Sequence, residues 1–475
     1  MKKILLVLLA IILIFAAVLL FNAFTLESRQ IDAEPLAQPE LPSGIYDRLA
    51  GAITFPTISV SEEAEPDSAA FKGFHKFLDS VFPRVHENLE LTLIGEYSLL
   101  YRWEGSDPAK KPVIFMSHQD VVPVDQPTLE DWEAGPFEGA ITDEYVIGRG
   151  TMDDKGTLMA LMESVELLLG EGYQPGRTIY LAFGHDEEVG GSNGAAKIAE
   201  YLEQQGVEAL ITVDEGGYLA QDLVPGVEAP VAVINLAEKG FASFDLVVET
   251  GGGHSSQPPR ENTIGILAQA IVDLENNQRP YKMVEPINHT LAFMGPELPF
   301  AERVAFANPW LLDGPILEAM NAHTTTAPTI ITGGVKNNVI PTVARATINF
   351  RILPGETIET VEEHIRSTVH DTIRVEPTGF LTNPSPVSKI DSEGFRVLQR
   401  TIRGLFPEAV VVPSLVGGGT DARYFYNISE DVYRFYPMRL SPENASRFHG
   451  IDEKISKENY AEIIGFTYHL IRELD

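Results

Sequence analysis

The chain has 475 residues, of which 44% are hydrophobic, with 68 acidic against 35 basic side chains, a formal charge of −33 and no cysteine. These values exclude a disordered chain, a disulfide-stabilised miniprotein, a Cys-ligated zinc finger, and enzymes that depend on an iron–sulfur cluster or a catalytic thiol. So negative a chain repels nucleic acid and anionic lipid headgroups, and we expect neither as a partner. A folded body of two or three domains remains.

The chain begins with an apolar run. Residues 4–24, ILLVLLAIILIFAAVLLFNAF, would form a helix about 30 Å long, the thickness of the hydrocarbon core of a bilayer. The run exceeds the apolar stretch of a typical signal peptide, and no small-residue cleavage site follows it. We therefore expect residues 1–24 to be an uncleaved membrane anchor, with a cleaved signal peptide as the alternative. Lys2 and Lys3 precede the run, so the charge bias places everything after residue 24 outside the cytoplasm.

Residues 25–44 show no helical or alternating apolar pattern and contain Pro35, Pro39 and Pro42 among charged and small residues. This composition predicts a linker between the anchor and the folded body.

From residue 45 apolar runs alternate with helical segments. Runs at 112–118, 178–185 and 209–215 predict buried strands, and apolar residues at helical spacing after Gly156 predict a helix that faces a core. Near-continuous apolar strands separated by helices predict an α/β fold with a mostly parallel sheet covered by helices. Ligands of such sheets bind beyond the carboxyl ends of the strands.

The middle of the chain has a different pattern of apolar and polar residues. Between residues 236 and 382, strands with alternating apolar and polar residues are mixed with amphipathic helices, which predicts an inserted α+β domain. Helix and strand segments then return over residues 383–475. We expect one catalytic domain in two parts, 45–235 and 383–475, on either side of the insertion.

Five short segments concentrate the residues suited to chemistry, and three of them directly follow a predicted strand. Strands of one parallel sheet would collect these groups on a single rim. Two imidazoles and several carboxylates without a thiol suit zinc, with manganese or cobalt as alternatives, and a shared carboxylate would give a binuclear site. An acidic, solvated surface is the alternative that these residues alone leave open. The residues are His118 and Asp120; Asp153 and Asp154; His185, Asp186, Glu187 and Glu188; Asp214 and Glu215; and His449.

The segments SHQD, GRGTMDDKG, GHDEEVGG and FHGIDE resemble the signatures of the cocatalytic zinc peptidases and amidohydrolases of metallopeptidase clan MH. That family includes aminoacylases, carnosine dipeptidases and succinyl-diaminopimelate desuccinylase. RLAGAITFPTIS, GHSSQPP, NNVIP and GGGTDARYF make the likeness closest to the branch of carboxypeptidase S and the N-fatty-acyl amino acid synthases/hydrolases. The resemblance runs from about residue 45 to the end. It implies a zinc-exopeptidase-like catalytic domain with an inserted lid and dimerisation domain.

The resemblance also implies a role for each matching residue. Asp153 would bridge two divalent ions, zinc by the resemblance, and its peptide bond to Asp154 is typically cis in the family. Asp120 would orient the imidazole of His118 through the ring nitrogen that does not bind metal. Glu187 would act as the general base and acid toward a water whose pKa the ions lower. The implied metal ligands are His118, Asp153 and Asp214 for one ion and Asp153, Glu188 and His449 for the other.

In relatives, a histidine of the inserted domain stabilises the oxyanion in the site of a dimer partner, and His254 matches that position. The resemblance therefore implies a homodimer. It also implies a substrate with a free carboxylate, either a short peptide or an N-acyl amino acid, from which an amino acid is released. The acyl side stays open. The residues implied in substrate binding are Arg351, Asn338, Gly418, Gly419 and Thr420.

Two rival functions fit parts of the sequence. GGSNG matches the G-x-S-x-G pattern, and Ser192, Asp421 and His449 would follow the residue order of an α/β-hydrolase-type serine hydrolase. The carboxylates that precede Ser192 would, however, repel a developing oxyanion. A non-catalytic membrane-tethered protein that binds metal or peptide would need the ligands and would tolerate the loss of Glu187. The presence of Glu187 favours an enzyme.

Overall fold

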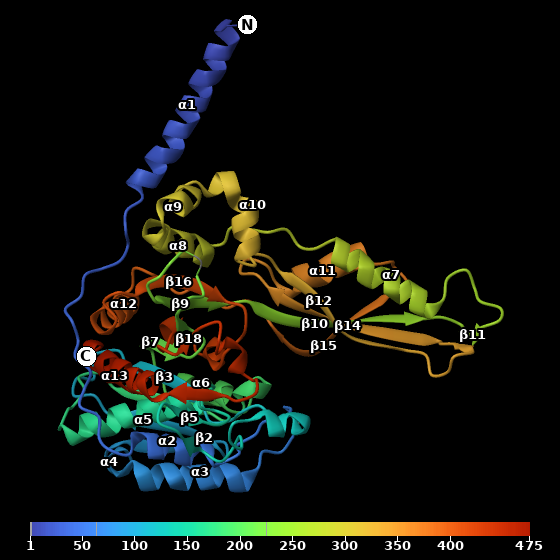
Figure 1. Cartoon of the computed structure of the whole chain (residues 1–475). Coiled ribbons are helices and arrows are strands. Elements are labelled where there is room, and N and C mark those ends of the chain that lie inside the picture. The colour runs from blue at the N-terminus through green and yellow to red at the C-terminus, as the bar shows by residue number, and fades with distance from the viewer. Residues whose placement is uncertain (1, 63, 225) are drawn as a thin grey trace.

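The structure is a computed structural model that describes residues 2–62, 64–224 and 226–475. A long helix stands off one end, a large sheet covered by helices forms the body, and a smaller sheet with two helices extends sideways from it (Figure 1). The helices are α1 (Lys2–Thr25), α2 (Ile45–Ile53), α3 (Ser68–Val81), α4 (Pro83–Asn88), α5 (Lys155–Gly170), α6 (Ala195–Gln204), α7 (Thr263–Asn276), α8 (Glu285–Met294), α9 (Phe300–Phe306), α10 (Pro309–Ala319), α11 (Ile358–Thr368), α12 (Glu393–Leu405) and α13 (Lys457–Glu473).

The strands fall into one large sheet and three smaller ones. They are β1 (Glu90–Ile94), β2 (Ser98–Trp103), β3 (Val113–His118), β4 (Ala140–Ile141), β5 (Tyr145–Ile147), β6 (Ile179–Gly184), β7 (Ala209–Asp214), β8 (Tyr218–Ala220), β9 (Val231–Glu238), β10 (Gly240–Glu249), β11 (Gly253–His254), β12 (Thr325–Gly333), β13 (Val339–Ile340), β14 (Val343–Ile352), β15 (Arg374–Thr382), β16 (Val410–Val416), β17 (Ser429–Arg434), β18 (Arg439–Leu440) and β19 (Lys454–Ser456).

The large sheet has the strand order β1-β2-β6-β3-β7-β17-β9-β8-β18, with β16 also paired to β9. Its centre is parallel, because β3 pairs with β6 and β7 in parallel and β7 with β17. Toward the edges β1–β2, β2–β6, β17–β9 and β8–β9 are antiparallel. Two further pairs outside the centre, β16–β9 and β18–β8, are parallel, so the expectation of a mostly parallel sheet holds in part and the sheet is mixed. An apolar run marks a buried strand but does not encode its direction.

The parallel centre positions the chemistry. The three predicted strands are β3, β6 and β7, and they are direct neighbours. Their carboxyl ends are His118, Gly184 and Asp214, so the segments that follow them share one edge of the sheet, as predicted.

Helix α5 begins directly after Asp154 and carries the predicted apolar stripe. Leu158, Leu161, Met162 and Val165 are fully buried. The helix contacts β3, α13, α2 and α4, which explains why it is buried on more than one face. The loop that precedes α5 is thereby held between two layers of the body.

The inserted domain is an antiparallel sheet of order β12-β14-β10-β15, with α7 and α11 packed on one face through Leu267, Leu274, Val361 and Ile365. Strand β14 alternates between exposed and buried positions along most of its length, as its sequence predicts. A two-stranded pair, β11 and β13, lies at the far end of this domain (Figure 1).

One part of the middle region does not belong to the inserted sheet. After α7 the chain returns to the body, where α8 packs on β16, and then forms α9 and α10 before entering β12. The sequence pattern does not predict these helices, because they are short, with Pro286, Pro299 and Pro309 at or next to their starts and Pro315 inside α10.

Helix α1 is long and apolar enough to cross a membrane, a property that it shares with signal sequences. The segment that follows, 26–44, has no helix or strand up to the turn before α2, as predicted, but it is bound to the body along its length. Gln30 exchanges hydrogen bonds of 2.8 and 3.0 Å with the backbone of Val411. The Leu36 amide donates to the Gly404 carbonyl at 2.8 Å. Further bonds join the carbonyls of Arg29 and Ile31 to Gln399 and Arg403 on α12, and that of Ala37 to His469 on α13.

These contacts predict that the segment stabilises the body. A chain that begins at residue 45 loses the six hydrogen bonds above, whereas a chain that begins at residue 26 keeps them. At about 0.5–1.5 kcal/mol net for each bond, we expect the shorter chain to be less stable by several kcal/mol. Its Tm, measured by scanning calorimetry, should be lower by roughly 2–4 °C for each kcal/mol lost. Equal Tm values would show that the segment is a free tether.

Candidate metal centre

The first site residue lies at the end of β3. His118 Nδ1 is 3.3 Å from Asp120 Oδ1, and both side chains are almost fully buried. The two oxygens of Asp120 also accept the backbone amides of Glu187 and Glu188, each at 3.1 Å. One buried carboxylate therefore orients the imidazole and fixes the segment after β6, so that two neighbouring strand ends are held in register.

Asp153 lies between two imidazoles. Its Oδ1 is 3.0 Å from His118 Nε2, and its Oδ2 is 2.9 Å from His449 Nε2. His449 Nε2 is also 3.2 Å from Glu188 Oε2. Burial opposes ionisation of Asp153, but the hydrogen bonds from the two imidazoles outweigh it and lower the pKa of the carboxyl. The peptide bond between Asp153 and Asp154 is cis, as the family resemblance implied.

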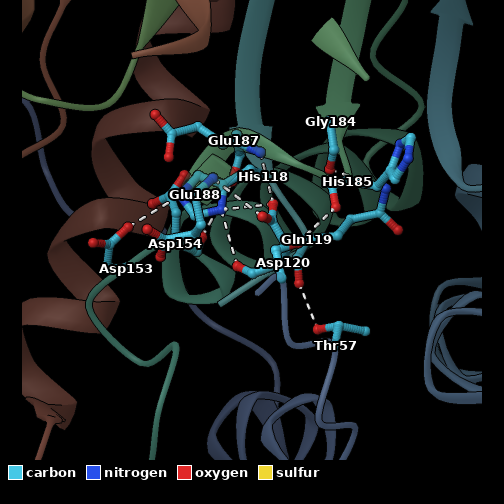
Figure 2. Close-up of polar contacts among 12 residues, drawn as sticks. Thr57, His118, Gln119, Asp120, Asp153, Asp154, Gly184, His185, Glu187 and Glu188 are labelled. Atoms are coloured by element: carbon cyan, nitrogen blue, oxygen red, sulfur yellow. Dashed lines mark hydrogen bonds and ion pairs between the residues drawn. The ribbon is translucent and has the colours of Figure 1, made fainter. Parts of the chain in front are cut away.

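Figure 2 shows His118, Asp153, Asp154 and Glu188 close together, while His185 lies on the other side of the strand ends. The His185 ring is bound to Ser98, with 2.6 Å between Nδ1 and Oγ.

A second buried ion pair holds the loops that carry Asp153 and His449. Glu453 Oε1 accepts the backbone amides of Gly150, Met152 and Asp153 at 2.7–3.2 Å. Its other oxygen is 2.7 Å from Arg149, and Arg149 donates to the carbonyl of His449 at 3.3 Å. The two parts of the catalytic domain are thus tied together at the centre. The sequence analysis missed Glu453, although it follows His449 in the quoted FHGIDE segment.

The end of β7 offers two adjacent carboxylates. Asp214, the predicted ligand, accepts the backbone amide of Ala422 at 2.9 Å. Glu215 Oε1 lies 3.7 Å from His118 Nε2, and Glu215 forms a cluster with His118 and Asp154 whose ligand atoms are within 4.8 Å of one another. The sequence analysis noticed Glu215 but assigned it no role. Neighbouring residues at a strand end face opposite ways, so an error of one position changes the assignment.

The rival serine triad does not form among these contacts. Ser192 Oγ donates to Glu62 at 2.8 Å, and His449 Nε2 faces Asp153 and Glu188. The described contacts therefore give the imidazole a metal-ligand environment and leave Ser192 on the surface.

His254 lies far from this centre in its own chain, at the far end of the inserted domain (Figure 1). It is exposed, and its Nδ1 is 2.8 Å from Ser256 Oγ. Asn338 lies beside it, since its carbonyl accepts the amide of Ser255 at 3.2 Å across the β11–β13 pair. The predicted residues His254 and Asn338 are therefore neighbours.

Arg351 sits at the end of β14 nearest the body, with its guanidinium 4.7 Å from the Phe241 ring centre. Burial and the nearby Arg423 lower the pKa of Arg351. Among the described residues, neither arginine forms a salt bridge. Thr420 is already engaged, because its amide and hydroxyl donate to Glu238 at 3.1 and 2.8 Å.

A cavity of about 360 Å³ opens beside the centre. Its lining includes Asp153, Asp154, Glu215 and His449 together with Gly418, Gly419 and Thr420. Its apolar lining comes from Met152, Tyr218, Val416, Tyr436, Met438, Leu440 and Phe448. The cavity therefore joins a group of potential metal ligands to an apolar chamber.

The donor set fits divalent ions. Burial raises the pKa of Glu188 and Glu215, and neighbouring carboxyls add to the rise. Glu188 Oε1 is buried and has no hydrogen-bond partner within the described part of the chain. Imidazole and carboxylate donors without thiols suit zinc, manganese or cobalt. A cation would relieve both the repulsion and the unpaired oxygen.

Comparison with known proteins agrees with this chemistry. Residues 114–473 match the signature of peptidase family M20/M25/M40. The chain is 41% identical over 478 residues to a probable carboxypeptidase S-like protein of Dictyostelium discoideum, covering 96% of this chain and 91% of the relative. It is 39% identical over 443 residues to the human N-fatty-acyl-amino acid synthase/hydrolase, covering 90% and 87%.

The fold is also that of solved family members. A metallo-carboxypeptidase of the M20 family from Sulfolobus solfataricus superposes with a TM-score of 0.66 at 21% identity, over 91% of this chain and 99% of the other. The predicted resemblance is thereby confirmed: the chain belongs to peptidase family M20/M25/M40 and is a hydrolytic enzyme of that family.

Proposed function

We propose that the chain is a binuclear, zinc-dependent hydrolase that releases an amino acid from an N-acyl amino acid or a short peptide. The observation that carries the proposal is the position of Asp153, which directs one oxygen to His118 and the other to His449. A carboxylate placed in this way suits two ions bound side by side. The proposed ligands are His118, Asp153, Glu188, Asp214 and His449, with Glu215 as the alternative to Asp214.

Bound ions would polarise the scissile carbonyl and lower the pKa of an attacking water. Glu187 accepts the proton of that water on its carboxylate and passes it to the departing amine nitrogen. The Asp120 carboxylate accepts the backbone amide of Glu187, which fixes the position of Glu187, and it also orients the His118 ring. The cations Arg351 and Arg423 lie near each other and attract the free carboxylate of the substrate.

The cavity supports an apolar acyl group. Its lining includes the apolar side chains of Tyr218, Met438, Leu440 and Phe448. An acyl chain or an apolar side chain of the substrate would be removed from water when it binds among them. This lining agrees with the names of both relatives, one a carboxypeptidase S-like protein and the other an N-fatty-acyl-amino acid synthase/hydrolase. We favour an N-acyl amino acid with an apolar acyl group as the substrate class.

Glu187→Gln tests the proton transfer. The amide keeps the size of the side chain but cannot accept the proton, so we expect kcat to fall by about 10²–10⁴-fold or more. Metal content, measured by plasma mass spectrometry, should stay at about two ions per chain. The matched control is Glu188→Gln, which should lose both activity and metal. Normal turnover by the Glu187 variant would remove this residue from the mechanism.

The choice between Asp214 and Glu215 is decided by metal content. Asp214→Asn and Glu215→Gln each replace one carboxylate by its amide, and the variant that lacks the true ligand should bind about one ion fewer per chain. The other variant should keep the full content. If both variants bind as much metal as the unaltered chain, the end of β7 supplies no ligand.

The role of His254 is tested by mixing two inactive chains. We propose that His254 enters the site of a partner chain, so a His254→Ala chain should receive the missing imidazole from a Glu187→Gln chain. Purified heterodimers should recover up to about half of the activity, since one of their two sites is complete. Heterodimers in which one chain carries both substitutions and the other carries Glu187→Gln serve as the control and should stay inactive. No recovery in verified heterodimers contradicts the shared site.

A further inference from the structure

Helix α9 packs against the C-terminal half of α1, and Trp310 in the first turn of α10 also contacts it, so we name residues 300–319 the α9–α10 platform (Figure 1). Two aromatic contacts fix the alignment: the rings of Phe15 and Trp310 are 5.9 Å apart, and those of Phe24 and Phe300 are 5.2 Å apart. Between them Asn22 Nδ2 donates to Asn308 Oδ1 at 2.8 Å. Asn308 in turn donates to the Leu19 carbonyl at 3.1 Å and is fully buried.

The platform keeps its two large aromatic side chains partly exposed beside their contacts with α1. Phe300 is 46% exposed and Trp310 is 55% exposed, which is unusual for large aromatic side chains. Between Arg303 and Glu318 the only charged residue of the sequence is Asp313. The charged residue Glu302 lies in the first turn of α9, near the contact between Phe300 and Phe24 at the C-terminal end of α1.

The length of α1 limits where this platform can be if α1 spans a membrane. The part of α1 before the first platform contact, Ile4 to Ile14, is about 16 Å long. The hydrocarbon core is about 30 Å thick, so this part alone cannot cross it. The remaining thickness must be filled by the stretch from Phe15 to about Phe24, which is the stretch that the platform contacts.

We propose that the α9–α10 platform enters the lipid bilayer beside α1, with the Trp310 ring in contact with lipid acyl chains. The proposal commits to a bilayer as the partner because the surface continues that of the apolar helix α1. The 5.9 Å contact with Phe15 places Trp310 at the depth of that residue, about 14 Å along α1 from Phe24. The platform is therefore a second, monotopic point of attachment.

The inner side of the platform is fixed to the body, so insertion would orient the whole catalytic domain. Phe306 packs on a cluster that includes Met294, Leu298 and Val410. The residues after α1 are bound along α12 and β16, as described above, which limits rotation of the body about α1.

The chain contains its own probe for this proposal. It has three tryptophans, and Trp103 and Trp132 are 3% and 7% exposed, so Trp310 is the one that solvent or lipid can reach. The full chain is reconstituted in phosphatidylcholine vesicles, a zwitterionic lipid chosen because of the net charge of −33. Half of the preparations contain lipid brominated along the acyl chains, which quenches tryptophan only on contact within the bilayer.

We expect brominated lipid to remove most of the Trp310 emission, defined as the part that disappears in the Trp310→Phe variant. Bromine deep in the acyl chain should quench more strongly than bromine near the headgroup. The Trp310→Phe chain keeps an apolar ring and should show no lipid-dependent quenching. Flotation of the vesicles and amide hydrolysis are measured on the same samples.

Unchanged Trp310 emission in chains that float with the vesicles would overturn the proposal, since α1 alone would then hold the membrane. Failure of the chain to float would also overturn it, because α1 would not be an anchor. Neither result depends on the hydrolytic assay, so the proposed function stands or falls separately.

Discussion

The mutual repulsion of carboxylates gathered at the ends of β3, β6 and β7 is the constraint that the site must satisfy. Taking several carboxylates out of water onto one sheet edge is unfavourable unless positive groups or hydrogen-bond donors face them. Asp153 meets this need with an imidazole on each oxygen, and Asp120 with His118 and two backbone amides. Glu453 uses Arg149 and three amides. His449 and Glu453 lie after the inserted sheet in the chain, whereas Asp153 and Arg149 lie before it, so the centre joins residues from both sides of the insertion.

Much of this arrangement follows from the sequence. Apolar runs identify β3, β6 and β7, and the shared edge of these neighbouring strands explains why His118, Glu188 and Asp214 lie near one another. Asp153 and His449 reach the same place from the loop before α5 and from the loop before β19. The antiparallel edges of the sheet could not be predicted, since apolar patterning carries no direction. Helices α8 to α10 could not be predicted, because prolines at their starts and inside α10 obscure the helical spacing of apolar residues. The bound course of residues 26–44 could not be predicted, because most of its hydrogen bonds are made by the backbone of the segment, whose partners the sequence does not encode.

The substrate residues show the limit of position matching. Arg351 stands at the body, whereas His254 and Asn338 stand at the opposite end of the inserted domain. No single chain can present all of them to one ligand, although each position matches the family pattern. Arg423, which the sequence analysis did not name, shares the surroundings of Arg351. Spatial neighbours of this kind emerge only when β14 and the segment after β16 are seen together.

The orientation of α1 determines the direction in which the inserted domain points relative to a membrane. In Figure 1 that domain projects sideways from the body, across the line of α1. If α1 stands along the membrane normal, the tip with His254 points along the bilayer surface, where other anchored copies diffuse at the same height and in the same orientation. Encounter then becomes a two-dimensional search, and a pair related by an axis parallel to the normal can bring each tip to the opposite cavity without either molecule leaving the lipid.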